Sequence, residues 1–280
     1  MGKDIMVIVH SVTEHHIRKE LDAMKTVKIK NVILGEGMPK ICVSLVADTI
    51  EQVKKQMEML VGLPHDIIEI RLDYFESLEK EFIKKAFGII RDMEKDTALL
   101  ATFRTKEEGG ERELSKAEYE SLYLWILEEK LVDSIDVELF QGEEVCRRLV
   151  KKAKEQEICT IFSNHDFNMT PKHEEIKERL RKMKELGADV VKMAVMPNSM
   201  EDVYRLLSIT TEIKEELQSP VITMSMGKEG MISRLIGEST GSCLTFGAGK
   251  KASAPGQISA DKLKEVLEII HTQMTEVGNH

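Results

Sequence analysis

Short apolar runs alternate with longer amphipathic stretches along most of this chain. The runs are rich in β-branched and other apolar residues, as buried strands are. They occupy residues 39–46, 66–72, 98–104, 132–139, 157–163, 188–195, 220–226 and 242–247. Near-continuous apolar strands separated by amphipathic helices indicate a parallel sheet covered by helices.

Several of the amphipathic stretches begin with a helix start signal. Three pairs have the spacing of a capping box, namely Asp48 with Glu51, Ser115 with Glu118, and Asn198 with Glu201. Pro171 after Thr170 predicts a further helix start, and a last helix is expected after Ser259.

Eight strand–helix units in about 240 residues match a TIM barrel, which typically has ~250 residues. An open, doubly wound sheet is the structural alternative, but no G-x-G-x-x-G follows the first strand. We therefore predict an α/β protein with a (β/α)8 TIM barrel.

Charge and cysteine content indicate which kinds of binding partner and which cellular compartment to expect. The 280 residues carry a net charge of −9 without a Lys/Arg-rich block, which argues against nucleic acid or an anionic membrane as the main partner. The four cysteines form no C-x-x-C pair, as expected for a reduced protein without structural zinc. The longest apolar stretches are too short to span a bilayer, and the first ten residues do not resemble a signal peptide. A cytoplasmic protein is expected.

Lys192 is a lone cation inside the apolar run 188–197. Loss of water around a primary amine disfavours its charged form, and a neutral lysine attacks carbonyl carbons. The alternative is a structural lysine whose stem packs while its head reaches solvent.

A barrel requires its chemistry at the carboxyl ends of the strands. Charged residues and one histidine fall there: Glu69, Arg71, Arg104, Glu138, His165 and Lys192. Buried charges are costly unless paired, so their convergence favours a site over a solvated rim. Met224 and Met226 are expected to form an apolar wall beside the amine, with ordinary core packing as the alternative.

The sequence suggests a role for several of these residues. Glu69 and Arg71 share a strand face, and we expect them to pair with each other or with Arg104. His165 is a candidate proton shuttle that Glu108 orients. A capping loop histidine and a solvated glutamate are the alternatives for these two.

Two segments after the last strands complete the candidate site. Arg234 offers a planar fork for a substrate carboxylate, although a surface arginine is equally possible from the sequence. The glycine-rich loop 247–257 contains Ser253 and Gln257. This loop could be a lid or a phosphate cradle.

Six segments in their order closely resemble the type I 3-dehydroquinate dehydratases. The segments are EIRLDYF, TFRTKEEGG, SNHDF, KMAVMP, TMSMGKEGMISR and TFGAGKKASAPGQI. The resemblance runs from about residue 27 to the last helix. It implies a TIM barrel that dehydrates 3-dehydroquinate to 3-dehydroshikimate in the shikimate pathway by syn elimination, without a metal or a cofactor. The family is typically dimeric, so a homodimer is expected.

The resemblance also assigns roles by position. Lys192 matches the lysine that forms a Schiff base, His165 the general base and Glu108 its carboxylate partner. The residues that match substrate-binding positions are Glu69, Arg71 and Arg104 for the ring hydroxyls, Arg234, Ser253 and Gln257 for the carboxylate and the C1 hydroxyl, and Ser44 for a pocket hydroxyl.

The resemblance implies that residues 27–37 form a β-hairpin closing the barrel floor. Residues 1–26 have no counterpart and are treated as an extension of a single catalytic domain, 27–280. Two other functions stay open, namely a class I Schiff-base aldolase acting on a phosphorylated sugar and a non-catalytic metabolite-binding barrel.

Overall fold

Eight parallel strands form one closed barrel in the computed structural model, which describes residues 26–249 and 254–276. The strands are β3 (Lys40–Leu45), β4 (Ile67–Arg71), β5 (Ala98–Thr102), β6 (Ser134–Glu138), β7 (Cys159–Asp166), β8 (Val190–Val195), β9 (Val221–Ser225) and β10 (Leu244–Gly247). Their order in the sheet is β10-β3-β4-β5-β6-β7-β8-β9, and a parallel bridge between Val221 and Ser242 joins the two ends. The predicted (β/α)8 barrel is confirmed.

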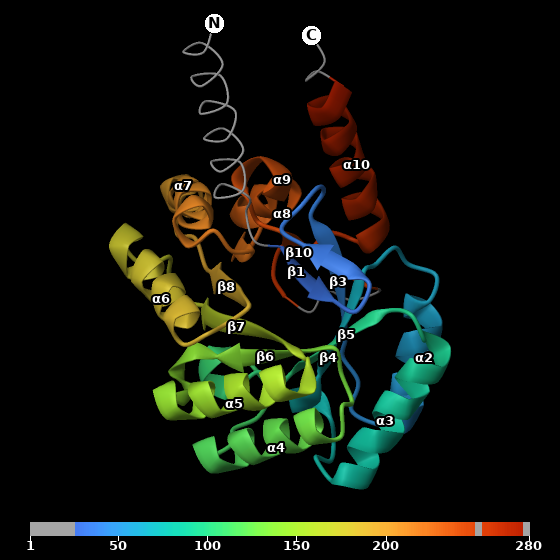
Figure 1. Cartoon of the computed structure of the whole chain (residues 1–280). Coiled ribbons are helices and arrows are strands. Elements are labelled where there is room, and N and C mark those ends of the chain that lie inside the picture. The colour runs from blue at the N-terminus through green and yellow to red at the C-terminus, as the bar shows by residue number, and fades with distance from the viewer. Residues whose placement is uncertain (1–25, 250–253, 277–280) are drawn as a thin grey trace, which may run out of the picture.

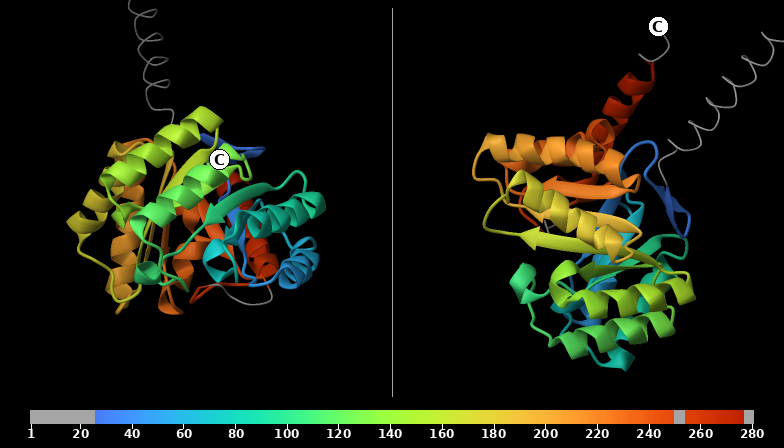
Figure 2. Two further views of the ribbon diagram at one scale, coloured as in Figure 1. Left: turned by 90° about the horizontal axis from the view of Figure 1, so that it is seen from below. Right: turned by 60° about the vertical axis from the view of Figure 1, so that its left-hand side comes forward.

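Helices surround this barrel on its outside (Figures 1 and 2). They are α2 (Ile50–Leu60), α3 (Lys80–Met93), α4 (Lys116–Glu128), α5 (Glu143–Gln156), α6 (His173–Glu185), α7 (Met200–Leu217), α8 (Ile232–Leu235), α9 (Gly237–Thr240) and α10 (Ala260–Glu276), with 3-10 turns at η1 (Leu72–Tyr74), η2 (Lys106–Glu108), η3 (Leu139–Gln141) and η4 (Glu229–Met231). Each long helix buries one apolar face. In α3, for example, Ile83, Phe87 and Ile90 recur at helical spacing and are at most 3% exposed.

The capping predictions were partly correct. Ser115 caps α4 in a complete capping box with Glu118, as predicted. Helix α2 instead begins after Thr49, whose hydroxyl accepts from the backbone N–H of Gln52 at 3.3 Å. The last predicted helix is confirmed as α10.

Two predicted helix starts were wrong by one or two residues. Helix α7 follows Ser199 rather than Asn198, whose backbone N–H donates to the Asp202 carboxylate at 2.8 Å. Helix α6 begins at His173, two residues after Pro171. The Thr170 hydroxyl donates instead to the carbonyl of Met196 in a neighbouring loop.

A two-stranded antiparallel hairpin precedes the barrel. Its strands are β1 (Val27–Ile29) and β2 (Val32–Leu34), and Ile29 and Leu34 are buried in one cluster with residues at the amino ends of the barrel strands, such as Ile67 and Ala98. The predicted hairpin at the barrel floor is therefore confirmed. The predicted extension falls almost wholly on residues 1–25, outside the described residues, and its boundary stays a prediction.

Side-chain alternation divides each strand between two environments. In β8, Val191, Met193 and Val195 belong to the cluster between sheet and helices, whereas Val190 and Ala194 belong to the barrel interior. Lys192 shares the interior face because side chains two apart point the same way. The interior is thus apolar near the floor and becomes polar toward the carboxyl ends. None of the helices in the described part of the chain is long and apolar enough to cross a membrane.

Candidate active site

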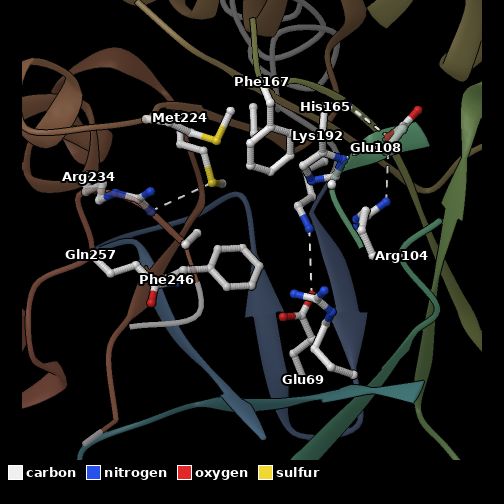
Figure 3. A pocket seen from close by; sticks show the side chains of 15 residues that line it. Glu69, Arg104, Glu108, His165, Phe167, Lys192, Met224, Arg234, Phe246 and Gln257 are labelled. Atoms are coloured by element: carbon white, nitrogen blue, oxygen red, sulfur yellow. Dashed lines mark hydrogen bonds and ion pairs between the residues drawn. The ribbon is translucent and has the colours of Figure 1, made fainter. Parts of the chain in front are cut away.

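A pocket opens at the carboxyl ends of the strands and contains most of the predicted site. Its volume is about 600 Å³ including the open mouth, a size suited to a small metabolite. Figure 3 shows the side chains that line it. They are Glu69, Arg71, Arg104, Glu108, Gly109, His165, Phe167, Lys192, Ala194, Met224, Met226, Arg234, Phe246, Ala254 and Gln257.

Lys192 is 3% exposed and lies in a more polar setting than its sequence neighbours indicate. Its Nζ donates to Asp136 Oδ2 at 2.9 Å and lies 3.9 Å from Glu69 Oε1. The ring of Phe246 covers it, with 4.6 Å between Nζ and the ring centroid. Flanking residues such as Val191 face the helices, so the residues next to Lys192 in sequence do not surround its amine. The alternative of a solvent-reaching head is excluded by the burial of the side chain.

Asp136 is a central member of the site that the sequence analysis missed. Its carboxylate is fully buried and accepts from Lys192, from Arg104 Nη2 at 2.9 Å and from Ser163 Oγ at 2.5 Å. Burial alone would raise the pKa of Asp136, but Arg104 and Lys192 outweigh it and hold that pKa well below its usual range. The available signal was the polar alternation of Ser134, Asp136 and Glu138 in an otherwise apolar strand.

His165 and Glu108 form a close pair on one side of the pocket. Nδ1 of the imidazole lies 2.9 Å from Glu108 Oε2, and the backbone N–H of His165 donates to the same oxygen at 3.0 Å. Burial, together with the charges of Arg104 and Lys192, lowers the pKa of His165 well below its usual value. The imidazole is therefore neutral near pH 7, as a proton acceptor must be.

Burial disfavours the negative charge of Glu108, whereas nearby hydrogen-bond donors favour it. Burial, with the neighbouring Glu138 carboxylate, raises the pKa of Glu108 to about 8, while Arg104 and Asn164 act in the opposite direction. Because Glu108 and His165 are in contact, their protons are shared by the pair rather than assigned to either residue alone.

Glu69, Arg71 and Arg104 lie together in the pocket but do not pair as expected. Glu69 accepts from the hydroxyls of Ser44 and Thr102 at 2.6 and 3.0 Å. These two hydroxyls orient the carboxylate of Glu69 toward the interior of the barrel.

The two arginines have carboxylate partners of their own. Arg71 forms a two-point ion pair with Asp73, at 2.8 and 2.7 Å, because the turn η1 brings Asp73 back toward the strand end. Arg104 donates to Asp136 and Glu138, both at 2.9 Å. The predicted mutual pairing was wrong, and each guanidinium is held rigidly by groups from other positions.

Arg234 on α8 is a buried cation without a carboxylate partner among the described residues. It is 1% exposed; Nη2 donates to the carbonyl of Pro255 at 3.1 Å, Nη1 lies 3.8 Å from Met224 Sδ, and Nε has no partner. Burial lowers the pKa of Arg234 to about 10. A surface arginine is thus excluded, and the free donor capacity suits an anionic group entering the pocket.

The loop after β10 contributes Ala254 and Gln257 to the pocket wall. Pro255 accepts from the backbone N–H of Gly227 at 3.3 Å, and Gly256 has φ +77° with its Cα facing the Gly227 carbonyl. A side chain on residue 256 would collide with that carbonyl, so glycine permits the contact between these two loops. Ser253, which was also predicted, lies outside the described residues.

The structure brings the remaining predicted residues together. Met224 and Met226 form an apolar part of the pocket wall, as expected, and Ser44 reaches the site through Glu69. Within residues 26–249 and 254–276, no group of three or more His, Cys, Asp or Glu residues is placed to hold a metal ion.

The fold and the site together define a (β/α)8-barrel enzyme with a buried lysine beside a histidine–carboxylate pair. The family model described as type I 3-dehydroquinase matches residues 41–274. The chain belongs to this family and is accordingly a hydro-lyase, so the resemblance seen in its motifs is confirmed.

Individual relatives agree with the family model over most of the chain. The 3-dehydroquinate dehydratase of Clostridium novyi is 46% identical over 250 residues, covering 89% of this chain and 99% of that protein. The protein of the same name from Bacillus licheniformis is 49% identical over 252 residues, with the same coverage. The crystal structure of type I 3-dehydroquinate dehydratase from Clostridium difficile with covalently modified comenic acid is 47% identical, with a TM-score of 0.86 over 89% of this chain and 98% of that one.

Proposed function

We propose that this chain dehydrates 3-dehydroquinate to 3-dehydroshikimate through a Schiff base on Lys192, as a step of the shikimate pathway. The observation that carries the proposal is the placement of the Lys192 amine in one pocket with the neutral His165 and with Arg234, which has no carboxylate partner among the described residues. The relatives named 3-dehydroquinate dehydratase support the choice of substrate.

The proposed reaction begins with attack of the neutral Lys192 amine on the C3 ketone. Loss of water from the resulting carbinolamine leaves a protonated imine, which draws electrons from C2. His165 removes a proton from C2, and the electron pair moves into the imine to form an enamine. His165 then returns the proton to the departing C1 hydroxyl, and hydrolysis of the iminium regenerates Lys192. The net change is loss of one water from the substrate.

The other pocket residues bind and orient the substrate in this proposal. Arg234 and Gln257, with Ser253, hold the substrate carboxylate and the C1 hydroxyl. Glu69, Arg71 and Arg104 bind ring hydroxyls through the hydrogen-bonding capacity left by their protein partners, and Ser44 keeps Glu69 oriented. Asp136 holds the Lys192 amine in the pocket and accepts its hydrogen bond before the attack.

Covalent trapping tests the proposal directly. Incubation with 3-dehydroquinate followed by borohydride reduction is expected to add the mass of the reduced adduct to the peptide containing Lys192. Formation of the conjugated enone product is followed in parallel by its ultraviolet absorbance. Turnover without an adduct on Lys192 would refute the mechanism, whereas an adduct only with phosphorylated sugars would favour a class I aldolase.

Replacing Arg234 by methionine is expected to raise stability and lower activity. An unpaired buried cation is costly, so its removal should raise Tm by about 2–4 °C, the shift that ~1 kcal/mol produces in a domain of this size. Loss of the charge-assisted hydrogen bonds to the substrate carboxylate should lower kcat/KM about 10–100-fold, chiefly through KM. Thermal unfolding and steady-state kinetics measure the two effects.

A matched control is Arg205→Met on α7, which removes an arginine that pairs with Asp202 at 2.8 Å outside the pocket. This variant should keep normal kinetics without gaining stability. A normal KM for Arg234→Met would contradict the assignment of Arg234 to the substrate carboxylate.

The pH dependence of kcat/KM should reflect the lowered pKa of His165. The base is active when unprotonated, and its pKa lies well below the ordinary value of 6.5. Activity should therefore persist as the pH falls below 6.5, and the acid limb should have its midpoint at a lower pH. The measurement is a pH profile at constant ionic strength. A midpoint at or above 6.5 would contradict the assignment of the base to a buried His165 whose pKa is lowered by Arg104 and Lys192.

A homodimer, a cytoplasmic location and a reaction without metal or cofactor belong to the same proposal. So does the division into an extension, 1–26, and one catalytic domain, 27–280. Sedimentation of the full-length protein tests the first of these.

A further inference from the structure

A chain of hydrogen bonds runs from helix α6 to the catalytic histidine of the proposed function. Arg179 Nη1 donates to Asn164 Oδ1 at 2.8 Å, and Asn164 Nδ2 donates to Glu108 Oε1 at 3.0 Å. The other oxygen of Glu108, Oε2, contacts Nδ1 of His165 at 2.9 Å. Asn164 is 1% exposed and does not line the substrate pocket, so it acts on the site only through Glu108.

The arginine determines which way the amide of Asn164 points. A guanidinium only donates hydrogen bonds, so the oxygen of the amide must face Arg179 and its NH2 group must face Glu108. The Arg179 side chain is itself held, since its guanidinium lies 5.5 Å from the centre of the Phe140 ring and pairs with Glu175. The amide is therefore fixed as a donor toward the carboxylate.

This fixed donor favours one protonation state of the Glu108–His165 pair. With Asn164 donating to one oxygen and the backbone N–H of His165 to the other, both oxygens of Glu108 act as acceptors. Burial raises the pKa of Glu108, and these donors oppose that effect by favouring the ionised carboxylate. A protonated Glu108 would donate its O–H to Nδ1 and so favour the opposite tautomer of His165. An ionised Glu108 then accepts from Nδ1–H of His165 and leaves the lone pair of Nε2 for the substrate proton.

The Glu108–His165 pair also lines a second cavity, on the side that faces Asn164 and Arg179. This cavity of about 940 Å³, open mouth included, is lined by Glu108, His165, Asn164 and Arg179 but not by Lys192. Glu108 lines this cavity although its side chain is buried, so its carboxylate has polar neighbours on this side as well as on the substrate side. Its orientation depends on the donors that surround it.

We propose that Asn164 and Arg179 are positioning residues for the reaction, which favour the ionised form of Glu108 and orient it so that His165 keeps the Nδ1–H tautomer. The inference rests on the proposed function for its kinetic consequences. The tautomer itself is a property of the free protein and is measured without substrate.

Asn164→Asp is the sharpest test because it keeps the shape of the side chain and replaces the donor with an acceptor. Two adjacent carboxylates share a proton, and the added negative charge raises the pKa of His165. We expect kcat to fall about tenfold or more with little change in KM, and the acid limb of the pH profile to move up by roughly one unit. Asn164→Leu should lower kcat without this upward movement.

Variants of α6 separate positioning from general stability. Arg179→Met should lower kcat several-fold, and Arg179→Lys should restore part of the loss because it keeps a donor near Asn164. Arg181→Met is the matched control on the same helix, since Arg181 pairs with Glu216 on α7 at a distance from the site. Its kcat should equal that of the unmodified protein.

Nitrogen-15 NMR of the His165 ring in the free protein decides the inference independently of turnover. We expect the Nδ1–H tautomer in the unmodified protein and a mixture of tautomers in Asn164→Leu and Arg179→Met. An unchanged tautomer in these variants, or an unchanged kcat and acid limb in Asn164→Asp, would overturn the inference. Failure of the unmodified protein to turn over 3-dehydroquinate would instead refute the proposed function. The tautomer measurement would still test the positioning role of Asn164 and Arg179.

Discussion

Lys192→Ala is expected to lower turnover of 3-dehydroquinate by roughly 10⁴-fold or more, the scale seen when a covalent nucleophile is removed. No other amine replaces it, because the remaining cations that line the described pocket, Arg71, Arg104 and Arg234, are guanidiniums. Substrate binding should persist, since these three groups are retained. Equilibrium binding and steady-state kinetics measure the two properties separately.

Lys192→Ala is also expected to lower the stability of the fold, and a control variant must separate this effect from the loss of turnover. Lys192 donates to the fully buried Asp136, and its loss leaves one oxygen of that carboxylate without the cation. Lys192→Ala should therefore also lower the free energy of unfolding. Combining it with Asp136→Asn removes the stranded charge and should recover part of the stability without recovering turnover.

Borohydride trapping completes this test. Lys192→Ala should show no covalent adduct, whereas Lys177→Ala, which removes an α6 lysine that pairs with Glu212, should give the normal one. Substantial turnover in Lys192→Ala would show that the reaction proceeds without the proposed imine.

His165→Ala is expected to reduce kcat by about 10²–10⁴-fold, the contribution of a general base, while imine accumulates on Lys192. The nucleophile remains in place, so the first covalent step is slowed less than removal of the C2 proton. The fold should be retained, because Glu108 still accepts from Asn164 and from the backbone N–H of residue 165.

The trapped fraction of protein, measured by intact mass after borohydride reduction, distinguishes these steps. The matched control is His173→Ala on α6, where the histidine contacts Glu212 outside the pocket, and it should behave as the unmodified protein. Near-normal turnover in His165→Ala would remove His165 from the role of base.

Much of the fold was predictable because its signals are local. Apolar runs of strand length and amphipathic stretches between them identified all eight barrel strands, and Ser115 with Glu118 identified a capping box. Helix starts at Asp48, Pro171 and Asn198 were predicted less well. Their capping depends on which nearby donor or acceptor each polar group finds once the loops are packed.

The site was predictable in its members and less so in their contacts. Position at a strand end selected Lys192 and His165, and position after the seventh strand selected Arg234. All three line the pocket. The pairing of Glu69 with Arg71 was wrong, since sharing a strand face does not make two side chains partners when Asp73 offers Arg71 a better geometry. Asp136 was missed because the alternation of Ser134, Asp136 and Glu138 indicates a polar strand face but does not tell whether that face lies inside the barrel or in solvent.

By itself, the sequence determined the order of the strands and helices, the family and the residue types at the strand ends. Only the tertiary structure decided that Lys192 meets Asp136, 56 positions earlier in the chain, and that Arg234 is buried without a carboxylate partner among the described residues. The physical reason is that strand and helix patterns depend on neighbours in sequence, whereas charge pairing inside a barrel depends on which strands closure brings face to face.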